Sequence, residues 1–192
     1  MKNPKYVYID VETTGLSPKK SGIIQLAGLI EVDGEIVSSF DYKMQPKPDA
    51  IIDPKAMEVN GILEEDIPSL MLMEEAYRKF IRELDFYVDR FDKADKVFFV
   101  GYNCQSFDCP FVRQWFSDNG NKFYGAYFWV NSIDIMCLAS EFLKYVRPEM
   151  PNFKQSTVAN FLGIDVDESN IHDAIYDINL TRDIYKKLTE EE

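Results

Sequence analysis

The fold of this chain is decided by the stretch YVYIDVETTG at residues 6–15. Its β-branched and aromatic residues predict a strand, although Asp is depleted in strands. Alternate side chains of a strand share a face, so Asp10 and Glu12 lie together with Tyr6 and Tyr8, with about 7 Å between the two anions. This spacing favours a divalent cation with oxygen ligands between them. The alternative is that Glu12 lies in a loop and Asp10 caps a turn before Gly15.

The composition predicts one domain over residues 1–192. The chain is 46% hydrophobic and 14% aromatic, which is enough to bury a single core. A strand begins almost at the N-terminus, so no secretory signal is predicted. The uncharged runs at 97–107 and 123–133 are shorter than the ~20 residues of a membrane span. Without zinc-ligand spacing, Cys104, Cys109 and Cys137 are expected to be small buried hydrophobes in a reducing cytoplasm.

The charge balance argues against tight, non-specific binding of nucleic acid. The chain has 21 Lys and Arg against 33 Asp and Glu, a net charge of −12, whereas a protein that grips a duplex usually carries a basic face. A nuclease that holds only a strand end is still compatible with this charge, because divalent ions and a few basic residues neutralise the phosphates at the site.

The hydrophobic pattern predicts an α/β domain with a mixed sheet. Three strands are expected to form an antiparallel meander, in which Asp33 and Gly34 make a hairpin turn. The helix expected from Pro68 to Val88 carries Leu72, Ala76, Phe80 and Leu84 on one face. The other elements follow from periodicity and turn residues: strands at 21–32, 35–43, 96–101 and 127–135, and helices at 54–60, 110–116, 136–146, 154–162 and 173–188.

Two further segments carry candidate site residues. The segment GYNCQSFD at 101–108 follows a buried strand, and Asp108 at its end lies where open α/β sheets place their ligand crevices. The alternative for Asp108 is a helix N-cap. The segment IHDAIYD at 171–177 holds His172, the only histidine, for which a solvated surface position is the alternative. Asp173 is the better candidate for the N-cap of the last helix, and the alternative for Asp177 is a surface carboxylate at the helix dipole.

Together these segments resemble the DEDDh branch of the DEDD 3′–5′ exonucleases, the DnaQ-like group that contains the proofreading subunit of bacterial replicative DNA polymerase. The resemblance spans residues 6 to about 188. Asp10 and Glu12 match D-x-E-T-T-G-L, Asp108 matches N-x-x-x-F-D, and His172 with Asp177 matches H-x-A-x-x-D. The segment VNGI at 59–62 is similar to the family's V-H-G-I, with Asn60 in place of the usual His. Enzymes of the tyrosine branch carry their base four residues before the last Asp, where this chain has Asp173, so the histidine branch matches better.

The resemblance implies a ribonuclease H-like fold with a five-stranded sheet and two Mg²⁺ or Mn²⁺ ions held by four carboxylates. By analogy, Asp10 would bridge both ions, Glu12 and Asp177 would lie on the ion of the nucleophile, and Asp108 would act through the other ion. His172 would take a proton from the attacking water, a role that suits an unperturbed pKa of ~6.5. The product would be a nucleoside 5′-monophosphate.

The substrate contacts are expected beside these carboxylates. Backbone N–H groups of Thr13, Thr14 and Gly15 are candidates for binding the terminal 3′-hydroxyl, and Leu16 is similar to a family residue that wedges between the last two bases. Phe107 or Ile62 would complete an apolar slot, although Leu16, Ile62 and Phe107 are equally compatible with the core. Asn60 and Asn103, which lie in the matched segments, complete the candidate set.

We therefore expect a cytoplasmic, metal-dependent 3′–5′ exonuclease acting on single-stranded 3′ ends, with DNA favoured over RNA. The enzymatic alternative is an oligoribonuclease-like enzyme for short oligonucleotides, and the non-enzymatic one is a catalytically idle, ribonuclease H-like binding module. The chain ends at Glu192 without a long tail for a polymerase or clamp. This favours a stand-alone enzyme or accessory protein, with a polymerase partner left open.

Overall fold

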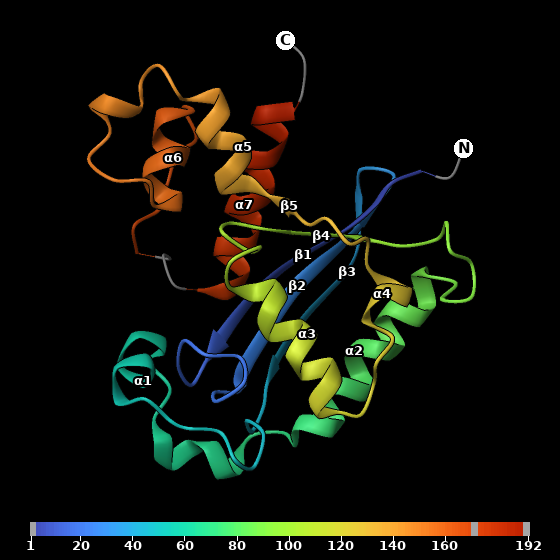
Figure 1. The fold of residues 1–192 in the computed structure, drawn as a ribbon. Coiled ribbons are helices and arrows are strands. Elements are labelled where there is room, and N and C mark those ends of the chain that lie inside the picture. Colours follow the sequence, from blue (N-terminus) through green and yellow to red (C-terminus); the bar gives the residue numbers. More distant parts are fainter. Residues whose placement is uncertain (1–2, 170–172, 190–192) are drawn as a thin grey trace.

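The central sheet organises the whole molecule. The computed structural model of the chain describes residues 3–169 and 173–189, and Figure 1 shows helices packed on both faces of the sheet. The sheet has five strands in the order β3-β2-β1-β4-β5. The strand that carries Asp10 and Glu12 therefore lies in the middle, with a neighbour on each side.

The first three strands form the predicted antiparallel meander. They are β1 (Lys5–Thr13), β2 (Ile23–Val32) and β3 (Glu35–Lys43). Asp33 and Gly34 have φ angles of 56° and 81°, and positive φ at both central positions is the requirement of a tight hairpin turn that matches the twist of its strands. The prediction of a hairpin at these two residues is confirmed.

The other two strands run parallel to β1 and are short. β4 (Phe98–Gly101) pairs with β1 from Tyr6 to Tyr8, and β5 (Ile133–Asp134) pairs only with the end of β4. The strand predicted over 127–135 was too long. The aromatic rings of Tyr124, Tyr127 and Phe128 pack on Phe116 instead of alternating between two sheet faces. The two tyrosines lie in the short helix α4 (Tyr124–Tyr127). Phe128 forms an isolated parallel bridge with Val97, the residue before β4.

The helix predicted from Pro68 begins later than expected. Pro68 lies inside the 3₁₀ helix η1 (Glu64–Ser69), and α2 runs from Met73 to Tyr87. Between them, Met71 bridges Met44 in parallel and accepts a hydrogen bond from the Gln45 N–H. This pairing holds the chain extended up to Leu72, which is 56% exposed and lies outside the buried face of α2.

The remaining helices follow the predicted order. α1 (Pro54–Asn60) is capped by the Asp53 side chain and ends at Gly61 with φ 66°. α5 stops at Phe142, earlier than predicted, before two turns and the 3₁₀ helix η2 (Arg147–Glu149) that contains Pro148. The other three helices are α3 (Asp108–Asp118), α6 (Gln155–Phe161) and α7 (Ala174–Thr189), while α5 itself begins at Ile135. Across the described ranges 3–169 and 173–189, none of these helices is long and apolar enough to cross a membrane.

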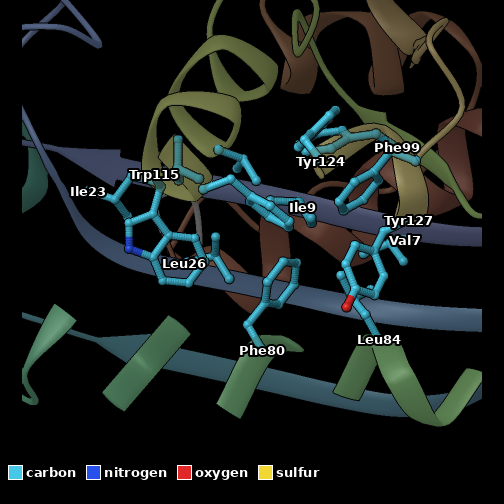
Figure 2. Packing of buried hydrophobic residues seen from close by; sticks show 14 of the residues in the cluster. Val7, Ile9, Ile23, Leu26, Phe80, Leu84, Phe99, Trp115, Tyr124 and Tyr127 are labelled. Carbon is cyan, nitrogen blue, oxygen red and sulfur yellow. The ribbon is translucent and has the colours of Figure 1, made fainter. Parts of the chain in front are cut away.

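Alternation along β1 divides the core in two. Val7, Ile9 and Val11 point toward α2 and α3, where they join Phe80, Leu84 and Trp115 (Figure 2). Tyr8 points to the other face, toward α5, α6 and α7. Asp10 and Glu12 follow Tyr8 at two-residue intervals, so they lie on the α7 side, as predicted from the strand period.

The three cysteines have different environments. Cys104 and Cys109 are buried, whereas Cys137 is exposed on α5. The expectation that all three are buried hydrophobes is therefore wrong for Cys137. Its neighbours Leu138 and Phe142 on α5 are also exposed, because α5 contributes only one face to the core beside α7.

Candidate active site

The candidate site lies where β1 and β4 separate. Their pairing ends at Tyr8 and Val100, and β4 itself ends at Gly101. Gly101 allows the two backbones to approach closely, because a Cβ there would lie 2.6 Å from Cβ of Cys104 and 3.1 Å from the carbonyl oxygen of Ile9. Beyond this point β1 continues to Thr13, and a crevice opens at the ends of the parallel strands, as expected for an α/β sheet.

Asp108 replaces the lost strand partner of β1. Its Oδ1 accepts a hydrogen bond of 3.1 Å from the N–H of Val11, which lies between Asp10 and Glu12. Asp108 is the first residue of α3, and the N-cap position belongs to Phe107. The alternative of Asp108 as an N-cap is therefore wrong, since its buried carboxylate is turned toward β1. This hydrogen bond joins the motif that contains Asp10 and Glu12 to the motif that ends at Asp108.

Carboxylates from β1, α3 and α7 lie close enough to affect the ionisation of one another. Asp10 is half-buried at the crevice. Burial of its carboxyl raises the pKa of Asp10 to about 7, and the negative charges of Glu12 and Asp177 contribute to this rise. Burial also raises the pKa of Asp108 well above its usual value, and the charge of Asp10 adds to this effect. Each added negative charge disfavours ionisation of its neighbours.

These four residues have the chemistry of a site for divalent cations. Carboxylate oxygens are the ligands that Mg²⁺ and Mn²⁺ prefer, and the raised pKa values of Asp10 and Asp108 indicate negative charge that a cation would offset. Within residues 3–169 and 173–189, no three Asp, Glu, Cys or His side chains already stand close enough to hold one metal ion together. The assignment of Asp10, Glu12, Asp108 and Asp177 as a two-metal centre is thus still a prediction.

Asp177 is positioned by the start of α7. Oδ1 of Asp173 accepts a 2.9 Å hydrogen bond from the Tyr176 N–H, so Asp173 caps the helix as predicted and Asp177 falls in the first turn. Nε2 of Gln155 donates to the carbonyl oxygen of Asp177 at 2.6 Å and to Oγ1 of Thr181 at 3.0 Å. The first residue of α6 thereby holds the turn that carries Asp177. The predicted base, His172, lies outside the described residues.

A cavity of about 440 Å³ opens beside Asp10, Glu12 and Asp108. Six of the predicted substrate-binding residues line it: Thr13, Gly15, Leu16, Asn60, Asn103 and Phe107. Leu16 is 84% exposed, so the alternative of a core residue is wrong for this position. Phe107 is half-buried and both lines the cavity and packs against the core. Asn60 fastens α1 to the end of β1, because its Nδ2 donates to the carbonyl oxygen of Thr13 at 2.8 Å.

Two predicted contacts, Thr14 and Ile62, lie outside this cavity. Thr14 is fully buried, its N–H donates to the carbonyl oxygen of Gly22 at 2.9 Å, and its hydroxyl donates to that of Ile51 at 2.8 Å. Because the N–H that was expected to reach substrate is already used, Thr14 is a structural residue. Ile62 packs against a small cluster with Ile24 and Met57, which is the core alternative.

The sequence did not point to several residues around the cavity. Lys55 and Val59 of α1 and Tyr102 of the loop after β4 also line it. Tyr102 precedes Asn103 in the second motif, and this adjacency was the signal available for it. Asp134 was missed as the organiser of that loop: its buried carboxylate accepts backbone N–H groups of Asn103, Gln105 and Met136 at 3.0–3.1 Å. Asn103 adopts a φ of 61° there.

Comparison with known proteins identifies the family. The family model RNase_T, described as Exonuclease, matches residues 7–185. The chain belongs to this exonuclease family. The matched residues include Asp10, Glu12, Asp108 and Asp177. The match confirms the predicted resemblance to DnaQ-like exonucleases and the assignment as an enzyme of this class.

Relatives of this exonuclease domain include much longer proteins. The PolC-type DNA polymerase III of Mycoplasmopsis pulmonis is 29% identical over 94% of this chain and 11% of that protein. DNA polymerase III subunit epsilon of Pasteurella multocida is 24% identical over 96% of this chain and 68% of the relative. The 3′–5′ exonuclease DinG of Bacillus subtilis is 32% identical over 59% of this chain and 11% of its own length. The chain thus spans 11–12% of the length of the PolC-type relatives.

Solved exonucleases share the fold. E. coli exonuclease I in complex with a dT13 oligonucleotide has a TM-score of 0.73 at 20% identity, over 95% of this chain and 40% of that one. Its zinc-bound complex with single-stranded DNA has a TM-score of 0.75 at 21% identity, over 97% and 40%. This likeness, with the five-stranded sheet of exonucleases, confirms the predicted ribonuclease H-like fold.

Proposed function

We propose that this exonuclease domain removes nucleoside 5′-monophosphates from single-stranded 3′ ends, with DNA favoured over RNA. The observation that carries the proposal is the convergence of Asp10, Asp108 and Asp177, from β1, α3 and α7, in one electrostatic field beside a cavity. The names of the relatives support it, because one is a 3′–5′ exonuclease and the matched exonuclease I structures hold DNA oligonucleotides.

Two divalent ions, Mg²⁺ or Mn²⁺, belong to this proposal. Asp10, Glu12, Asp108 and Asp177 would hold them through carboxylate oxygens. When bound, such ions neutralise phosphate charge and make water a stronger nucleophile at neutral pH. One matched exonuclease I structure contains zinc, which supports a divalent requirement and leaves the choice of ion to experiment.

The protein itself provides position and shielding. The hydrogen bond from Val11 fixes the Asp108 carboxylate against the strand that carries Asp10 and Glu12. A cavity of about 440 Å³ is within the usual range for small-ligand sites and would take a terminal nucleotide. Leu16 on its rim would stack against a base and keep water away from the end of the strand. In this proposal His172 accepts the proton of the attacking water as general base.

The names of the relatives also support a setting for this activity. DNA polymerase III proteins of the PolC type and subunit epsilon are among them, so we place the proposed reaction in DNA replication or repair, in the cytoplasm. A polymerase partner is compatible with these relatives and would bring the strand end to the site.

Incubation with end-labelled oligonucleotides tests the proposal. Single-stranded DNA and RNA with a 5′ label should be shortened from the 3′ end in Mg²⁺ or Mn²⁺, with release of mononucleotides and no reaction in chelator. Asp108→Asn should abolish this shortening. The matched control is Asp118→Asn at the opposite end of the same helix, where the carboxylate only accepts a hydrogen bond from Gln114, and it should cleave as wild type does. Release from the 5′ end, or cleavage that persists in Asp108→Asn, would refute the assignment.

A further inference from the structure

Two buried thiols lie on either side of Asp108 in the sequence: Cys104 is in the loop after β4, and Cys109 is the second residue of α3. Cys104 is fully buried and Cys109 is 7% exposed, and both are free cysteines. The two thiols are close enough for each to affect the ionisation of the other. Cys137, by contrast, is exposed on α5, so the chain carries one close pair of thiols and one separate thiol.

The backbone holds the two cysteines close together. The N–H of Cys109 donates to the carbonyl oxygen of Cys104 at 2.9 Å, which brings the two Cα atoms near the separation of bridged cysteines, commonly about 5.5–6 Å. Sγ of Cys104 also donates to the carbonyl oxygen of Ile133 at 3.7 Å, and the Cα of Gly101 leaves no room on its other side. The Cys104 side chain is therefore confined next to Cys109.

A small oxidant has a route to the pair. Cys109 lines a cavity of about 140 Å³ together with Gln105, Arg113 and Ser132. This volume exceeds the roughly 30 Å³ that a water molecule occupies in the liquid, and hydrogen peroxide is only one oxygen atom larger than water. The polar side chains around the cavity can hydrogen-bond such a molecule.

We propose that Cys104 and Cys109 form a modification site, at which a hydroperoxide converts the two thiols to a disulfide that inactivates the neighbouring nuclease centre. The Cys109 sulfur bonds to one peroxide oxygen as the O–O bond breaks, which gives a sulfenic acid and, for hydrogen peroxide, water. The Cys104 sulfur then displaces the sulfenic oxygen, which leaves as a second water with the remaining thiol proton. Two thiols are oxidised and one peroxide is reduced.

The coupling to activity rests on the proposed function. Asp108 directly precedes Cys109, accepts a hydrogen bond from the Val11 N–H of β1 and is the first residue of α3. A disulfide requires a sulfur–sulfur distance of about 2.05 Å, so its formation draws Cys109 toward Cys104 and shifts the first turn of α3. Displacements of about 1 Å at a reacting centre can cost roughly 100-fold in rate. We therefore expect loss of nuclease activity on oxidation and its return on reduction.

Mass spectrometry tests the disulfide without any assay of activity. Trypsin should release residues 97–113, bounded by Lys96 and Arg113 and containing both cysteines. After treatment of the folded wild-type protein with hydrogen peroxide and alkylation in denaturant, this peptide should take up no alkyl group and be lighter by two hydrogen atoms. After dithiothreitol it should take up two groups. A peptide that stays fully alkylated while Cys137 is oxidised would overturn the proposal.

Activity measurements test the consequence. The nuclease rates of wild type and of the control Cys137→Ser should fall by a factor of at least about 10 in hydrogen peroxide. Both rates should recover in dithiothreitol. Cys104→Ala should form no disulfide and keep more of its activity. A disulfide that forms in wild type without loss of rate would overturn the inhibition. A protein with no activity before oxidation would refute the proposed function, and the rise in melting temperature on adding Mn²⁺ would then report whether the disulfide displaces Asp108.

Discussion

Asp10 lies in an electrostatic environment that disfavours its ionised form. Burial of its carboxyl, and then the negative charges of Glu12 and Asp177, raise its pKa to about 7 from a usual value of 3.8. A group whose pKa is raised by folding favours the folded state only while it is protonated. The stability of the metal-free protein should therefore depend on pH in a direction opposite to that of a salt-bridged carboxylate.

The first prediction concerns this pH dependence. Below pH 3.8 Asp10 is protonated in both states. Between pH 3.8 and about 7 the unfolded chain binds fewer protons than the folded one, so the free energy of unfolding falls as pH rises and levels off above pH 7. Asp10→Asn should reduce this decline and leave the part due to Asp108, whose pKa is also raised by burial. At pH 8 in chelator it should stabilise the protein by on the order of a few kcal/mol. Urea melts of both proteins across this range measure it.

The same variant should respond less to metal. Ions that bind only the folded state stabilise wild type by about 2.7 kcal/mol at a hundred times their dissociation constant, and Asp10→Asn should gain less. Asp108→Asn should behave in the same way, because the Asn oxygen can still accept the Val11 N–H. If both variants melted below wild type in chelator, the four carboxylates would be better described as structural.

The second prediction concerns catalysis. Because the carboxylates act as a unit, Asp10→Ala and Asp177→Ala should each lower kcat by roughly three orders of magnitude or more. His172→Ala should leave a small residual rate with an altered pH profile, since the carboxylates would still hold the ions. Single-turnover rates on a short DNA strand from pH 5 to 9 measure this, and a near wild-type rate for Asp10→Ala would contradict the site assignment.

Individual residues were predictable where strand and helix periods fix them. The period of two in β1 placed Asp10 and Glu12 on one face, and the position of Asp108 after a buried strand placed it at the crevice. Burial of Thr14 and exposure of Leu16 were not readable, because both belong to the turn after β1. Its shape depends on two backbone hydrogen bonds of Thr14, whose N–H donates to the carbonyl oxygen of Gly22 and whose carbonyl oxygen accepts from the N–H of Asp53. Both partners come from other parts of the chain.

At the scale of elements, α7 is attached to the sheet by a buried ion pair. Nε of Arg182 donates to Oε2 of Glu31 on β2, and Nη2 of Arg182 donates to the carbonyl oxygen of Gly34 at 3.2 Å. Glu31 is only 5% exposed. This pair holds the helix that carries Asp177 against the strand next to β1, so it helps to set the position of the fourth carboxylate.

The third prediction tests this attachment. Arg182→Met should destabilise the protein by about 3–5 kcal/mol, because it leaves a buried charge on Glu31 without its partner. The matched control is Lys144→Met, which breaks the exposed pair with Glu141 and should change stability by about 0–1 kcal/mol. Denaturant unfolding gives both values. Glu31→Gln in the Arg182→Met background should restore part of the loss, and equal effects of the two Met variants would contradict the argument.

Element boundaries failed where long-range pairing overrides local pattern. The residues before α2 looked helical, but Met71 pairs with Met44 and holds the chain extended. The aromatic residues before β5 looked like a strand, but their rings pack on α3. In both segments the deciding partner is far away in the sequence. The hairpin of β2 and β3 was predictable because its partners are adjacent.

At the scale of the whole molecule, the net charge of −12 limits how the protein can hold an anionic substrate. The cavity beside Asp10, Glu12 and Asp108 is the proposed binding site. Lys55 is the cation that lines this cavity in the described part of the chain. Binding should therefore depend on the strand end and the divalent ions more than on a long contact with the phosphate backbone.

The fourth prediction is a weak dependence of affinity on salt. A single strand loses affinity with a logarithmic slope of about 0.7 per neutralised phosphate, so contact with up to about three phosphates gives a slope of about 2 or less. Titration of labelled oligonucleotides of increasing length with Asp177→Ala, at several salt concentrations, measures it. Digestion should also be distributive, with release after each cleavage. Processive digestion and a steep slope would instead indicate a basic surface that contacts a long stretch of the phosphate backbone.

The central place of β1 has a consequence for how the protein opens in solution. Its backbone amides pair with β2 along nearly the whole strand and with β4 over the first half, and Val11 is held by Asp108. Amides in such a strand exchange with deuterium mainly when the entire domain opens. Those of Val7 to Val11 should therefore be among the slowest to exchange, and the first motif should keep its shape until the molecule unfolds globally.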